Sequence, residues 1–69
     1  MRLVIEPRLA DPDGLYSALI AAHEGLTEAA SRRLDAKLVL LLANHIGDQA
    51  VVEEAIALAR RTLLPEATP

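Results

Sequence analysis

The polar side chains that could take part in chemistry follow directly after an apolar run. The segment from Leu38 to Ala43 is wholly apolar, and Asn44 and His45 come next, with Asp48 three residues further on. A carboxylate beside an imidazole raises the basicity of the histidine, as a proton-transfer site requires. The same residue types also suit a helix end, where histidine complements the helix dipole and asparagine can bond free carbonyls. Both interpretations stay open.

A second histidine, His23, closes another apolar segment. It borders an apolar helix face, so it can serve either as a boundary residue of that helix or as part of a site. Together with its neighbours and the first cluster, it defines a candidate small-ligand or minor catalytic site at the ends of helices in an oligomer interface. The candidate binding residues are Tyr16, His23, Glu24, Asn44, His45 and Asp48.

Established catalytic and metal-binding patterns are missing from the sequence. The chain has no cysteine, its histidines are 22 positions apart, and no H-E-x-x-H or E-x-x-H spacing occurs. No serine lies in a G-x-S-x-G setting, and the glycines are isolated instead of forming a phosphate-binding loop. We therefore expect no catalytic residues, no metal and no cofactor, and a non-enzymatic protein.

Nucleic-acid binding is also disfavoured. The segment from Ala43 to Gly47 resembles the turn of a helix-turn-helix motif, but the helix after it begins beside Asp48 and carries Glu53 and Glu54. These carboxylates would face the phosphates, and the net charge of −3 adds to the repulsion.

Capping signals divide the chain into three helices. Asp11 and Pro12 suit a helix start, Thr27 suits a second, and Gly47 followed by Asp48 ends one helix and begins the next. The fold expected is all-α, one small domain with a central second helix that forms a hairpin with the third. The segments are an extended arm at 1–10, helices at 12–24, 28–46 and 49–64, and a tail at 65–69.

Composition indicates that this domain needs a partner chain. Of its 69 residues 52% are hydrophobic, but only Tyr16 is aromatic, and there is no disulfide. A core of this size rarely supplies more than about 3–5 kcal/mol without disulfides, metal or oligomerisation. From Leu38 the second helix is apolar on every side, which is typical of a helix surrounded by protein. We expect a homo-oligomer, such as a dimer, or a larger protein partner, with the interface at Val39, Leu40, Leu42 and Ile46.

The longest apolar run is too short to span a bilayer, and the N-terminal residues do not read as a signal peptide. We therefore expect no membrane association and a cytoplasmic location.

Three segments resemble a known family: D-P-D-G at 11–14, A-H-E-G-L at 22–26 and L-L-L-A-N-H-I-G-D at 40–48. The sequence is similar over about residues 3–60 to a family of small bacterial proteins that consist of a domain of unknown function. Members of that family are often encoded beside flavin-dependent aromatic hydroxylases, so the resemblance implies a small accessory subunit of a larger enzyme. The family has no assigned catalytic residues, and none is carried over.

Overall fold

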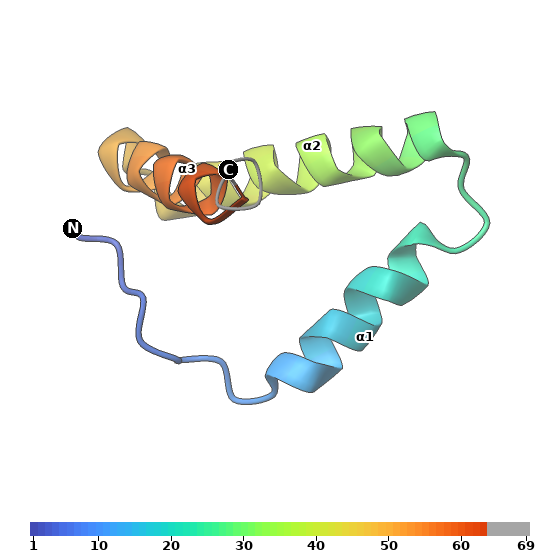
Figure 1. Cartoon of the computed structure of the whole chain (residues 1–69), viewed down its shortest axis with the longest axis horizontal. Helices are drawn as coiled ribbons and strands as arrows, with labels where there is room; N and C mark the ends of the chain where they lie inside the picture. The colour runs from blue at the N-terminus through green and yellow to red at the C-terminus, as the bar shows by residue number, and fades with distance from the viewer. Residues whose placement is uncertain (64–69) are drawn as a thin grey trace, which may run out of the picture. The chain divides into compact units, whose positions relative to one another are not determined.

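The computed structural model describes residues 1–63 and confirms the all-α fold. Three helices follow one another along the chain: α1 (Pro12–His23), α2 (Glu28–Ile46) and α3 (Gln49–Leu63), as Figure 1 shows. No strand is present within these residues. The first ten residues form the N-terminal arm and carry no regular secondary structure. The expected tail at 65–69, and position 64 of the expected third helix, lie outside the described residues.

Side chains fix where each helix begins. In every case an oxygen of the residue before the helix accepts a hydrogen bond from a backbone N–H three residues on, which satisfies one of the free donors of the first turn. The three contacts are Gly14 N to Asp11 Oδ1 at 3.0 Å, Ala30 N to Thr27 Oγ1 at 3.1 Å, and Val51 N to Asp48 Oδ1 at 3.3 Å.

Glycines in the left-handed region mark the helix ends. Gly25 has a φ of 78° and Gly47 a φ of 70°, values that side chains with a Cβ rarely adopt. Helix α1 ends one residue before the expected boundary, because Glu24 is already extended with a ψ of 136°. The short connection after Gly47 lets α3 follow α2 almost at once.

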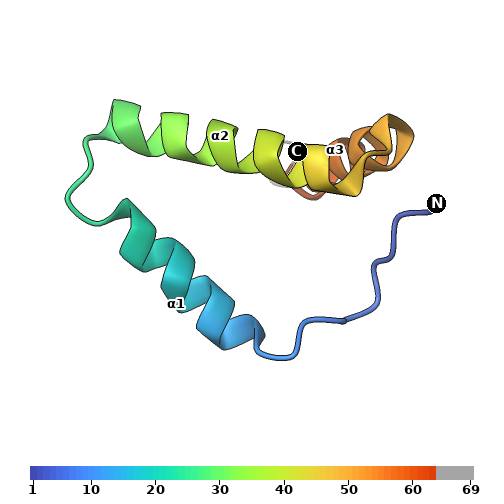
Figure 2. The same ribbon diagram turned by 180° about the vertical axis from the view of Figure 1, so that it is seen from behind.

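The chain divides into two compact units. One consists of Glu6–Leu41, and the other of Met1–Ile5 together with the chain from Leu42 onward. Helix α2 contributes to both units, and Figures 1 and 2 show it as one unbroken helix from either side.

The unit that contains α3 packs around one side of that helix. Val51 is 5% exposed and is the only buried side chain among residues 1–63. Val52, Ala55 and Leu58 on the same helix are half-buried, as is Leu3 of the arm.

In the Glu6–Leu41 unit, the residues that are partly shielded lie on facing sides of α1 and α2. Leu19 and His23 of α1 are half-buried, and so are Ala30, Leu34 and Leu38, which recur every four residues on α2. A spacing of four keeps residues on one side of a helix. The partly shielded residues of each helix thus form a narrow strip, and the strip on α1 includes His23.

Candidate functional site

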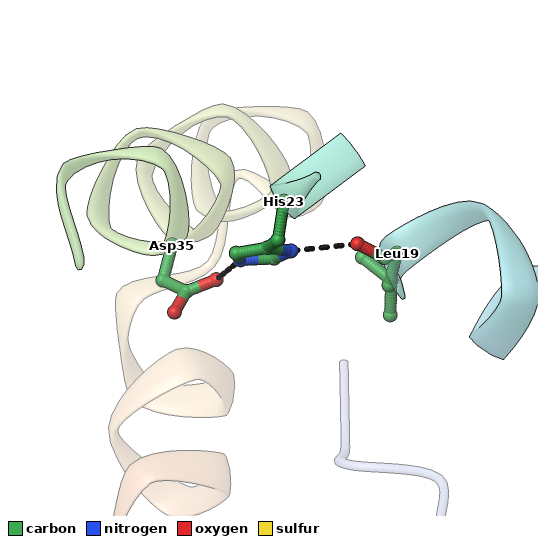
Figure 3. A network of polar contacts seen from close by, with 3 residues as sticks. All are labelled: Leu19, His23 and Asp35. Atoms are coloured by element: carbon green, nitrogen blue, oxygen red, sulfur yellow. Dashed lines mark hydrogen bonds and ion pairs between the residues drawn. The ribbon is translucent and has the colours of Figure 1, made fainter. Parts of the chain in front are cut away.

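His23 forms hydrogen bonds through both nitrogens of its ring, one within α1 and one to α2. Nδ1 donates to the carbonyl oxygen of Leu19 at 2.6 Å, and Nε2 donates to Oδ1 of Asp35 at 2.7 Å, as Figure 3 shows. A carbonyl and a carboxylate can only accept hydrogen bonds, so both ring nitrogens must carry a proton for both bonds to form. The geometry therefore favours the charged imidazolium form of His23.

The same contacts shift the titration of this ring. The backbone hydrogen bond to Leu19 is the largest cause, and the hydrogen bond to Asp35 the next, of a pKa of His23 that is raised above its ordinary value of 6.5. With both nitrogens already bonded to the chain's own groups, the ring has no free nitrogen to offer a substrate or a metal. The hydrogen bond from His23 to Asp35 thus links α1 to α2 and has a structural role.

The other candidate residues near His23 do not join this network. Tyr16 is exposed on α1. Glu24 is the residue that ends α1, and its backbone N–H donates to the carbonyl of Ala21 at 3.2 Å. Neither side chain forms a hydrogen bond or ion pair within residues 1–63.

The second group of candidates belongs to the other unit. Asn44 and His45 are exposed in the last turn of α2, where the helix dipole favours a histidine. Asp48 is half-buried and caps α3, and its Oδ2 lies 3.7 Å from the amino group of Met1. Over residues 1–63 no ion pair connects His45 with Asp48. The structure thus describes the six candidates as two separate sets.

Among residues 1–63, no group of three or more His, Cys, Asp or Glu side chains is placed so that it could hold a metal ion. Within the same range, no helix combines the length and the apolar character needed to cross a bilayer.

The most unusual surface of the molecule is the middle of α2. Val39, Leu40, Leu41 and Leu42 are 53%, 69%, 69% and 54% exposed. Successive residues of an α-helix point about 100° apart, so four in a row cover its whole circumference. Ile46, one turn after Leu42, is exposed as well. We call Val39–Leu42 together with Ile46 the apolar segment of α2.

One contact of the candidate site was missed from the sequence. The side chain of Asp35 is mostly exposed, yet it binds His23. The available signal was weak: Asp35 lies next to Leu34, on the side of α2 that packs, and its charge is opposite to that of a protonated histidine.

The fold and its surface define a small all-α protein with an uncovered aliphatic helix. Residues 3–61 match the model of a family described as "Protein of unknown function (DUF2783)". Because this match covers most of the chain, the chain belongs to that family, and the matched range includes all three segments on which the sequence resemblance rests. Comparisons with curated proteins and with solved structures find no match.

Proposed function

We propose that this protein acts as a non-enzymatic interaction subunit, which binds another protein chain through the apolar segment of α2. The partner is a second copy of the chain or a larger protein. Among larger proteins, the family resemblance suggests a flavin-dependent aromatic hydroxylase, for which this chain would be a small accessory subunit. The proposed contact residues are Val39, Leu40, Leu42 and Ile46.

The observation that supports this proposal is the exposure of Val39–Leu42 on all sides of the helix. Single exposed leucines are common, but contiguous apolar patches larger than a few hundred Å² on a protein surface mark interaction sites. Here the patch also lies on a regular helix, which presents it without a large cost of ordering on binding.

The magnitude of the effect favours the same conclusion. Covering a leucine or valine side chain stabilises a protein by about 1.5–3 kcal/mol relative to leaving it in water. Since the chain has one buried side chain among residues 1–63, its own packing leaves most of this free energy unused. A partner that covers the apolar segment of α2 would recover several such contributions at once.

The test replaces two exposed leucines of the segment by glutamate. Leu40→Glu/Leu42→Glu puts charge into the proposed interface, while glutamate keeps a high helix propensity. If the partner is a second copy, we expect sedimentation and native mass spectrometry of the wild type to give a mass above the 7.4 kDa of one chain. If the partner is a larger protein, we expect the wild type to capture that protein from its host in a pull-down. The double variant should lose either behaviour and keep its helical circular dichroism.

A matched control lies on the same helix. Ala36→Glu/Lys37→Glu changes two neighbouring exposed positions one turn before the apolar segment, and assembly should persist. A wild-type chain that is monomeric at micromolar concentration and captures no protein would refute the proposal.

A further inference from the structure

Helix α3 carries an acidic pair and a basic pair of side chains at equal distances on either side of Ala57. Glu53 and Glu54 precede Ala57, and Arg60 and Arg61 follow it, so that each pair is centred about 5 Å along the helix axis from Ala57. At about 100° per residue, all four charges lie within about 60° of the direction of Ala57. All five residues are exposed. We call this surface the charged face of α3.

This face lies opposite the packed side of the helix. The buried and half-buried residues of α3 are Val51, Val52, Ala55 and Leu58, and none of them belongs to the charged face. The charged face is therefore free to meet another molecule without disturbing the packing of its own unit.

The acidic and basic pairs do not neutralise each other within the helix. One turn after Glu53 and Glu54 come Ala57 and Leu58, so the favourable i, i+4 pairing is missing. The arginines lie two turns away, about 10 Å along the axis. Within residues 1–63, the only side-chain bond of these four residues is from Gln49 Nε2 to Glu53 Oε2 at 2.8 Å. The charges are thus available to a partner.

We propose that α3 binds α3 of a second copy of this chain in the antiparallel direction, about a twofold axis at Ala57. Reversing the direction of one helix about this point places the glutamate pair of one copy opposite the arginine pair of the other, at both ends of the contact. A parallel pair in the same register would place like charges together. This inference rests on the proposed interaction function, names the partner as an identical chain, and adds the charged face of α3 as a second contact of the same dimer.

Small and apolar residues complete the contact. Ala57 is exposed at the centre of the charged face and Ala50 on the same side of the helix two turns before it, and their size allows two helices to approach closely. Ile56 and Leu63 border the face and are 56% and 70% exposed. The twofold axis brings Ile56 of both copies to the same side of the pair. Charge complementarity of this kind fixes direction and register, whereas buried apolar area supplies most of the affinity.

The experiment uses two charge reversals in the full-length chain. Glu53→Arg/Glu54→Arg makes the face wholly positive, and Arg60→Glu/Arg61→Glu makes it wholly negative. Each variant alone should dimerise at least 10-fold more weakly than the wild type in sedimentation equilibrium. Mixed in equal amounts, the two should form a heterodimer with an affinity near that of the wild-type homodimer, because opposite charges again meet at both ends.

The chain offers a closely matched control, since Arg32 and Arg33 are a second exposed arginine pair, on α2. Arg32→Glu/Arg33→Glu should leave dimerisation within about 2-fold of the wild type. Circular dichroism checks that each variant is folded. If a reversal fails to fold, Glu53→Gln/Glu54→Gln serves in its place, and it should weaken the dimer and reduce its sensitivity to NaCl.

The outcomes separate this inference from the proposed function. Reversals that leave the dimer unchanged, or a mixture that stays monomeric, would overturn the α3 pairing while the Leu40→Glu/Leu42→Glu test still decides the proposed function. A wild-type chain that is monomeric but captures a larger protein would also overturn the pairing and would retain the interaction function. A monomer that binds nothing would overturn both.

Discussion

Each of the two units of this chain is stabilised internally by a different kind of contact. In the unit that contains α3, the side chain of Val51 is buried, and aliphatic neighbours on one side of the helix surround it. In the Glu6–Leu41 unit no side chain is buried, and the best-defined link between α1 and α2 is polar, from Asp35 to His23. One unit thus has the beginnings of a hydrophobic core, whereas the best-defined contact of the other is a charged hydrogen bond.

This difference shows how a very small chain distributes its stability. Burying aliphatic area stabilises a protein at any pH, whereas a partly exposed ion pair adds little and depends on protonation. The stability of the Glu6–Leu41 unit should therefore change more with pH and with bound partners than the stability of the unit that contains α3. Substitutions in each unit can test this contrast.

The largest effect is expected at the buried valine. Val51→Asp places an unpaired carboxylate at the one position that is buried among residues 1–63 and should lower the free energy of unfolding by about 3 kcal/mol or more. Ala59→Asp introduces the same group at an exposed position of the same helix and should cost less than about 1 kcal/mol. Urea unfolding followed by circular dichroism measures both. Equal losses in the two variants would contradict the assignment of a core to this unit.

A smaller effect is expected at the cap of α3. Asp48→Ala removes the acceptor for the N–H of Val51 and should cost about 1 kcal/mol. Asp48→Ser keeps a capping oxygen but loses the charge near the amino group of Met1, so it should restore most of the loss. If the serine variant were as unstable as the alanine variant, the ion pair and not the cap would be the important contact.

The smallest effect, which should vary with pH near neutrality, is expected at His23. Because the pKa of His23 in the folded chain is raised above 6.5, the folded chain binds this proton more tightly than the unfolded chain. The stabilisation that protonated His23 gives the folded chain is therefore fully present below about pH 6.5, and it is lost as the pH rises through the raised pKa of His23. Hydrogen exchange of the α1 amides should accordingly become faster over that range.

Two variants check the cause of this pH dependence. Asp35→Asn keeps the shape of the side chain and removes its charge, so an NMR titration should show the pKa of His23 moving back toward 6.5. His23→Gln should remove the pH dependence of exchange altogether. Exchange in α1 that accelerates equally with pH in wild type and His23→Gln, after correction for the intrinsic rates, would show that another group is responsible.

Local signals made most of the fold predictable. The caps Asp11, Thr27 and Asp48 act on backbone groups only three residues away, so their role can be recognised without knowing the tertiary structure. The glycines at 25 and 47 likewise adopt the left-handed conformation that a helix end requires. Three helices and their order follow from these few positions.

Contacts between helices were less predictable. The bond between His23 and Asp35 depends on how the loop after α1 returns the chain, and the spacing of 12 residues carries no periodic signal. The packed side of α3 is also narrower than its apolar composition suggests, because Ile56 and Leu63 are exposed. Sequence periodicity identifies apolar residues, but not how many of them the chain itself can cover.

The bare aliphatic circumference of α2 at Val39–Leu42 has a cellular consequence. If the proposed partner covers this surface, a copy without that partner offers chaperones and proteases the kind of surface by which they recognise incompletely folded chains, so its lifetime should be short. The amount of this protein in a cell would then follow the supply of whatever occupies that helix, and overproduction of the chain alone would yield degradation or aggregates.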